Sequence, residues 1–190
     1  MKAINLLLFF LLVTITAIGQ QPKHILITYY SKTGHTKALA EEVAKGVKLV
    51  KGVELKIKTI EQTTHSDLLA ADAIILGSPV HNANAAPEVL KFIQDWPFAG
   101  EPLKNKLGAV FVTAGGISAG EELVQVNLLH SMMIFGMIII GGDHWTSAFG
   151  TSAITGEGVY KTGQQLDSLF IKKAHNFGKR VAEVSKKINN

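Results

Sequence analysis

Short apolar segments alternate along the chain with segments whose apolar residues recur at helical spacing. The short segments are continuous or alternating apolar runs rich in β-branched residues, which predicts strands. They cover residues 24–30, 53–58, 72–77, 107–113 and 137–140. Strict alternation in the second segment indicates a half-exposed edge strand, whereas the continuous apolar run at 73–76 in the third indicates a strand buried on both faces.

The segments between these strands predict helices. Leu39, Val43, Val47 and Val50, for example, lie on one helical face. The predicted helices cover residues 36–50, 66–71, 87–96, 120–135 and 164–187. Strands that alternate with helices require a mostly parallel sheet covered on both faces, so the chain is predicted to form one α/β domain.

The first nineteen residues have the pattern of an export signal. Lys2 precedes an uncharged apolar run over residues 6–15, and the small residues Ala17 and Gly19 predict cleavage before Gln20. The alternative is a membrane anchor, but about ten apolar residues are too few to cross about 30 Å of hydrocarbon. We therefore expect a signal peptide over residues 1–19, a folded domain over residues 20–190, no stable membrane insertion, and an exported, periplasmic protein.

Composition narrows the chemistry. Hydrophobic residues make up 47% of the chain and charged residues 18%, which excludes a disordered protein. Cysteine is absent, so disulfides, thiolate metal sites and cysteine nucleophiles are excluded. The seven histidines show no metal-ligand spacing, and we expect no metal site. The net charge of +4 comes from dispersed lysines, which does not imply a nucleic-acid partner.

The segment between the first strand and the first helix is the strongest candidate site. It holds three hydroxyl side chains and a glycine at a helix N-terminus, where free N–H groups and the helix dipole favour an anion. The pattern matches neither the P-loop nor the dinucleotide fingerprint, so a monophosphate is the better candidate. The alternative is an ordinary helix N-cap. The residues are Ser31, Lys32, Thr33, Gly34, His35 and Thr36.

Two further loops of small and polar residues follow the third and fourth strands, at 77–84 and 113–120. Ligands of such sheets bind outside the carboxyl ends of the strands, so a flat heterocycle could lie between these loops. A predicted loop over residues 141–163 contains six glycines, and loops of that length are normally functional or disordered. The alternative is that all of these are plain connections.

The motifs at 29–36, 77–79 with Asn84, 106–111, 113–116, 135–138 and 149–156 occur together in this order. In combination they resemble the flavodoxin-like NAD(P)H:quinone oxidoreductases named after tryptophan-repressor-binding protein. The resemblance implies a three-layer, doubly wound sheet of five parallel strands in the order 2-1-3-4-5. It also implies FMN as cofactor, a homo-oligomer (dimer or tetramer), and two-electron transfer through flavin N5 from NAD(P)H to a quinone or similar acceptor.

In that family the first loop holds the FMN phosphate and the next two hold the ring. The resemblance therefore adds ring-binding candidates to the first-loop residues. They are Pro79, Val80, His81, Asn82 and Ala83 in the second loop, and Thr113, Ala114, Gly115 and Gly116 in the third. No catalytic side chain is required, because the cofactor supplies the hydride chemistry.

The chain departs from the family pattern at Phe135 and at His81–Asn82, positions that we expect near the ring pocket. His81 is either a proton donor toward the ring or acceptor, or a solvated loop residue. Residues 96–98 and 144–145 offer aromatic surfaces for stacking, or else pack in the core. Three functions stay open: a quinone reductase, an electron-carrier flavodoxin and a non-catalytic FMN-binding module. The electron donor is NAD(P)H or, for an exported chain, a protein partner.

Overall fold

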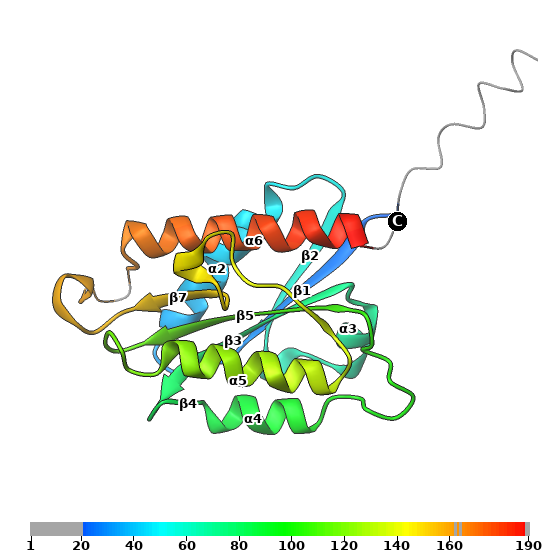
Figure 1. Cartoon of the computed structure of the whole chain (residues 1–190), viewed down its shortest axis with the longest axis horizontal. Helices are drawn as coiled ribbons and strands as arrows, with labels where there is room; N and C mark the ends of the chain where they lie inside the picture. Colours follow the sequence, from blue (N-terminus) through cyan, green and yellow to red (C-terminus); the bar gives the residue numbers. More distant parts are fainter. Residues whose placement is uncertain (1–20, 162, 164, 189–190) are drawn as a thin grey trace, which may run out of the picture.

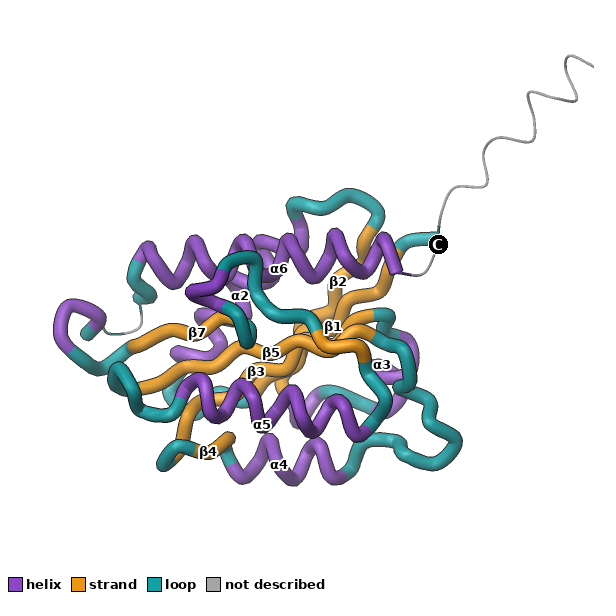
Figure 2. Tube along the Cα trace, in the orientation of Figure 1, coloured by secondary structure: helices purple, strands orange, loops and turns teal. Residues whose placement is uncertain are grey.

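The protein is described here from a computed structural model, which covers residues 21–161, 163 and 165–188. The predicted signal peptide lies outside the described residues. A sheet lies between two layers of helices (Figures 1 and 2). The helices and strands are β1 (Lys23–Tyr29), α2 (His35–Lys48), β2 (Val53–Thr59), α3 (His65–Ala70), β3 (Ala73–His81), β4 (Asn84–Ala85), α4 (Pro87–Gln94), β5 (Leu107–Ala114), α5 (Glu121–Ile134), β6 (Ile138–Ile139), β7 (Thr151–Ile154) and α6 (Ser168–Ile188).

The sheet confirms the predicted architecture. Its strands follow the order β2-β1-β3-β5-β6, and each neighbouring pair along that path is parallel. This is the expected order 2-1-3-4-5, with β6 as the fifth strand. The sheet has seven strands rather than five, because β4 pairs with β3 and β7 pairs with β5.

Alternation along the strands divides the core between the two faces of the sheet. Ile25 and Ile27 of β1 join the cluster beneath α2 and α6, whereas Leu26 between them joins the cluster beneath α3, α4 and α5. Phe111 and Val112 of β5 divide in the same way. Because both faces are covered, the ends of the strands are the open part of the sheet (Figure 1).

Helices α2 and α6 approach each other backbone to backbone. A Cβ atom added to Gly46 of α2 would collide with the carbonyl oxygen of His175, and one added to Gly178 of α6 would collide with that of Val43. Glycine at both positions therefore allows an interhelical contact that any side chain would separate. A hydrogen bond of 2.7 Å between His175 Nε2 and Glu42 Oε2 adds a polar link.

The third strand extends beyond its predicted end at Gly77. Ser78 and Pro79 continue the parallel pairing with β5, and the chain then turns back through Asn82 and Ala83 into β4. Glycine and proline indicated a turn at this point. The glycine does not mark a turn. It is required because the ring of Phe111 occupies the space that a side chain at residue 77 would need.

The predicted loop over residues 141–163 is wrong in part. Within it, β7 pairs in parallel with β5 over four residues, continuing the edge that β6 begins. The fifth strand is therefore split by an excursion over residues 141–150. Glycines at 141, 142 and 150 permit close backbone contacts there, since a Cβ atom at each would collide with a carbonyl oxygen. The predicted glycine-rich loop therefore contains a short edge strand, and its other described residues are irregular or form short helical turns.

We expect Gly46→Ala to destabilise the protein by about 2 kcal/mol. The added methyl group must displace the α6 backbone, and overpacking of this kind exceeds the gain of about 1 kcal/mol in helix propensity. Urea unfolding followed by circular dichroism measures the change. The control is Glu41→Ala, an exposed change on the same helix that should stay within about 0.5 kcal/mol of the wild type. Unchanged stability of Gly46→Ala would contradict the close helix contact.

Candidate functional site

The three predicted loops meet at the carboxyl edge of the central strands. Tyr29 is level with Gly77 across β1 and β3, and Pro79 is level with Thr113 across β3 and β5. The backbone N–H of Tyr30 donates to the Gly77 carbonyl (3.1 Å) as the first loop leaves the sheet. The sequence-predicted candidates are thus brought together in one region, at the end of the sheet toward which β1, β3 and β5 run.

The first loop presents the open N-terminus of α2. Gly34 is the N-cap residue in a left-handed conformation (φ 94°) and has no side chain with which to cap the helix, and the first turn of α2 has no acidic residue. The Ser31 hydroxyl accepts a bond from the Lys37 N–H (3.1 Å) and so fixes the loop to the helix. Because glycine adopts this φ without strain, the backbone N–H groups of the first turn can face an anion.

His35 orders the outer side of this loop. Its Nε2 lies 2.7 Å from the carbonyl oxygen of Gly163, and its Nδ1 lies 3.2 Å from the Thr33 hydroxyl. A carbonyl can only accept, so Nε2 carries the proton. In the neutral ring Nδ1 then accepts from Thr33. The contact joins the first loop to a segment 128 residues further along the chain.

A buried hydroxyl pair connects the first loop to the third. Thr36 Oγ1 and Thr113 Oγ1 are 2.8 Å apart, and both residues are buried. The Thr36 side chain therefore packs inside the loop and is not exposed to a ligand. The pair fixes the helix N-terminus of α2 relative to the end of β5.

The second loop is a tight hairpin between β3 and β4. Asn82 and Ala83 have φ values of 50° and 60°, a left-handed pair that two-residue hairpin turns require. A Cβ atom at Gly120 would lie 2.7 Å from the Cα of Ala83, so the hairpin tip packs against the start of α5. The second and third loops are thus in contact.

The third loop is held by a carboxylate that sequence reasoning missed. The backbone N–H of Ile117 donates to Glu157 Oε2 (2.6 Å), and the N–H of Thr155 donates to the Ala114 carbonyl (2.9 Å). Gly115 faces open space. The only sequence signal for Glu157 was its position between two glycines in the segment that follows β7. Folding places this segment along the third loop.

A second missed group lies beside the first two loops. The Tyr30 hydroxyl donates to Glu88 Oε1 (2.9 Å). The pKa of Glu88 is lowered, first by a hydrogen bond from its own backbone N–H and then by Tyr30, with smaller contributions from the charges of His81 and Lys32. The same hydrogen bond raises the pKa of Tyr30. Lys32 of the first loop and His81 of the second therefore both lie near the carboxylate of Glu88.

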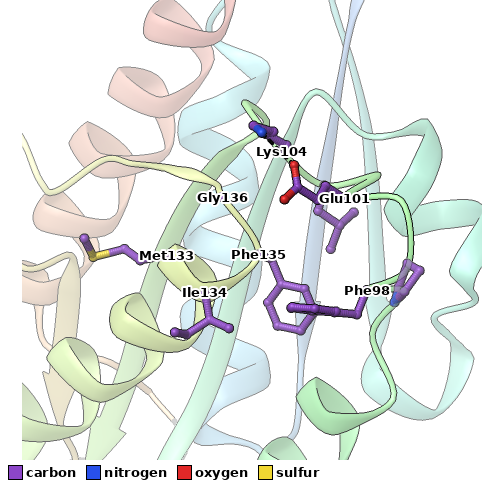
Figure 3. Close-up of a pocket in the computed structure, with 9 residues that line it drawn as sticks. Phe98, Glu101, Lys104, Met133, Ile134, Phe135 and Gly136 are labelled. Atoms are coloured by element: carbon purple, nitrogen blue, oxygen red, sulfur yellow. Dashed lines mark hydrogen bonds and ion pairs between the residues drawn. The ribbon is translucent and has the colours of Figure 1, made fainter.

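Two expected neighbours of the ring pocket lie elsewhere. Phe135 packs against Trp96 and Phe98, with ring centroids 5.4 and 5.7 Å away. Phe98 and Phe135 border a cavity of about 200 Å³ (Figure 3). This cavity lies at the amino edge of the sheet, since Lys104 and Gly136 of its lining precede β5 and β6. Trp96 is a core residue. The placement of Phe135 near the ring pocket was therefore wrong, and residues 96–98 do not reach the candidate site.

Trp145 is exposed in the excursion between β6 and β7. The ammonium group of Lys173 in α6 donates to the carbonyl of Thr146 (2.9 Å) and so attaches this excursion to the helix.

Among the described residues, no three His, Asp or Glu side chains form a cluster that could hold a metal ion. No described helix is long and apolar enough to cross a bilayer.

Comparisons with known proteins agree with this geometry. The family model for NADPH-dependent FMN reductases matches residues 58–152. A flavodoxin of Aquifex aeolicus is 30% identical over 143 residues, which cover 70% of this chain and 75% of the relative. A flavodoxin of Clostridium saccharobutylicum is 33% identical over 118 residues, which cover 62% and 72%. The chain belongs to the flavodoxin-like family.

A solved structure shows the same fold. The flavodoxin, WrbA-like protein of Agrobacterium tumefaciens superposes with a TM-score of 0.74 over 88% of this chain and 99% of that one, at 19% identity. The match to the FMN reductase family and to the flavodoxins indicates FMN as the cofactor of this chain, and the candidate loops fit it. The N-terminus of α2, with glycine at the N-cap and no acidic residue in the first turn, suits a phosphate, and the open backbone at Gly115 leaves room for a ring.

We expect FMN to bind at least tenfold more tightly than riboflavin, which lacks the phosphate. An anion at this helix N-terminus with charge-assisted hydrogen bonds contributes more than ~1.4 kcal/mol. The double substitution Ser31→Ala, Thr33→Ala should weaken FMN and leave riboflavin nearly unaffected. Flavin fluorescence quenching measures both constants, with riboflavin as the internal control. Equal affinities for the two flavins would exclude a phosphate site.

Proposed function

We propose that the protein is an FMN-dependent oxidoreductase that transfers two electrons from NAD(P)H to a quinone or a related acceptor. The observation that carries the proposal is the match to NADPH-dependent FMN reductases over residues 58–152, which include β3 and β5 and the loops that follow them. Residues 31–36 and the loops at 79–83 and 113–116 are the proposed cofactor-binding residues.

Bound FMN supplies the redox chemistry, because a flavin accepts a hydride at N5 and returns two electrons to an acceptor. The chain's own residues supply binding and orientation. The N-terminus of α2 would hold the phosphate, and Glu157 fixes the third loop by accepting a hydrogen bond from the Ile117 N–H. Reduction of a quinone consumes two electrons and two protons. His81, partly exposed at the end of β3, is the proposed proton donor toward the acceptor.

The second candidate function is that of an electron carrier. It is favoured by the two relatives named flavodoxin, at 30% and 33% identity. A carrier needs a protein partner and no substrate pocket. The enzyme and the carrier therefore differ in turnover with small molecules and in how the two electrons are gained.

We expect the FMN-loaded protein to reduce benzoquinone at the expense of NADPH, at a rate well above that of free FMN at equal concentration. Steady-state absorbance of NADPH measures turnover, and stopped-flow mixing measures reduction of the bound flavin. His81→Gln should lower turnover by a larger factor than it lowers FMN affinity, because a proton donor acts on the acceptor whereas a loop residue only contributes to binding.

A carrier gives a different result. It would show negligible turnover, and a redox titration would resolve two well-separated one-electron potentials. That outcome would contradict the proposed enzyme function and support the electron-carrier function. Slow reduction by NADPH with fast benzoquinone reduction from dithionite-reduced protein would assign the donor role to a protein partner.

We further propose that the protein is a homo-oligomer and that residues 1–19 direct export to the periplasm, where a quinone acceptor and a protein donor would meet it. Light scattering of the FMN-loaded protein at tens of micromolar should give a dimer or tetramer mass. A reporter enzyme active only after export should be active when fused behind residues 1–20. A monomer mass contradicts the first proposal, and an inactive fusion contradicts the second.

A further inference from the structure

A group of lysines lies at the amino edge of the sheet, where α2 and α6 both end. The Lys186 ammonium donates to the carbonyl of Lys51 (2.8 Å), which brings the last turn of α6 against the turn between α2 and β2. In Figure 1 the red end of α6 lies close to the blue start of β1. We call this surface the basic end and define it as Lys48, Leu49, Lys51, Lys186 and Lys187.

Within the part of the chain that the structure describes, carboxylates leave most of the positive charge of the basic end unpaired. Among the described residues, Lys48, Lys51 and Lys187 form no ion pair, and all three are exposed. The acidic residues of the same helices have other partners. Glu42 binds Lys45 at 2.7 Å, and Glu183 lies 3.7 Å from Lys179.

Helix dipoles account for only part of this arrangement. Lysines in a last helical turn interact favourably with the helix C-terminus, which applies to Lys48, Lys186 and Lys187. It does not apply to Lys51, which lies in the turn. It also leaves unexplained why Leu49, between these lysines, is 67% exposed.

An exposed leucine among unpaired lysines is the pattern of a bilayer-binding surface. The lysines attract anionic headgroups, and the apolar side chain enters the boundary between headgroups and acyl chains. A nucleic-acid surface of similar charge would be expected to present aromatic rings for stacking, and none of the residues of the basic end is aromatic.

The chain also enters the fold at this surface. The Lys23 N–H donates to the carbonyl of Gly52 (3.1 Å), one residue after Lys51. Contact with a bilayer here would leave the three loops at the opposite edge of the sheet accessible.

We propose that the basic end is a docking surface for an anionic phospholipid bilayer. The surface acts by charge attraction through its lysines and by insertion of Leu49. Its function is independent of FMN chemistry, because none of its residues belongs to the cofactor loops. Each lysine near such a surface should contribute about fivefold to the partition coefficient, so three of them contribute about 100-fold.

The test is co-sedimentation of the mature chain, residues 20–190 after the predicted cleavage, loaded with FMN, with vesicles of phosphatidylcholine alone or with 40% phosphatidylglycerol, at low and high salt. We expect preferential binding to the anionic vesicles that is lost at high salt. Lys48→Gln, Lys51→Gln, Lys187→Gln should remove about 100-fold of it, and Leu49→Ser several-fold.

The matched control is Lys91→Gln, Lys161→Gln, Lys172→Gln, which removes the same charge from exposed lysines elsewhere. It should retain most of the anionic preference. Thermal melting and FMN affinity should be unchanged in all variants, which separates this proposal from the cofactor site. An equal loss of anionic preference in both triple variants would overturn the proposed docking surface, because it would show that the net charge of the whole protein determines binding. No preference for anionic vesicles, or binding to a polynucleotide that ignores Leu49→Ser, would also overturn it.

Discussion

The parallel alignment of β1, β3 and β5 is the constraint on which the rest of the molecule depends. Both faces of these strands are apolar and must be covered, so the helices pack on the faces and the ends of the strands stay open. Since the strands run in one direction, their carboxyl ends place three separate loops at one edge. The Thr36–Thr113 hydroxyl pair and the packing of Gly120 on Ala83 then fix the loops to one another.

The order of strands and helices could be predicted because it depends on local pattern. Continuous apolar runs identified the central strands, and helical periodicity identified α2, α4, α5 and α6. The predictions failed where a local signal competed with packing. Gly77 and Pro79 indicated a turn, but Gly77 is there to admit the ring of Phe111, and the strand continues. The glycines around β7 indicated a loop, although they permit close backbone contacts beside a strand.

The residues of the candidate site could likewise be predicted only where the signal is local in sequence. The hydroxyl-rich loop at 31–36 could be found because an anion site at a helix N-terminus is local in sequence. Glu157 could not, because its relation to Ile117 exists only after β7 has paired with β5. Phe135 was misplaced for a related reason. It precedes the fifth strand, so it belongs to the amino edge of a parallel sheet, as its contacts with Trp96 and Phe98 show.

The direction of the strands also separates two kinds of chemistry. Helices that follow strands in this fold begin near the carboxyl edge and end near the amino edge. Their positive N-terminal dipoles therefore gather where a phosphate must be held, and their negative C-terminal dipoles gather at the other end, where lysines are favoured. The N-terminus of α2 and the basic end, which includes Lys48 of the same helix, are the two results. Contacts at the basic end need not disturb the cofactor loops, because the length of α2 separates the two sites.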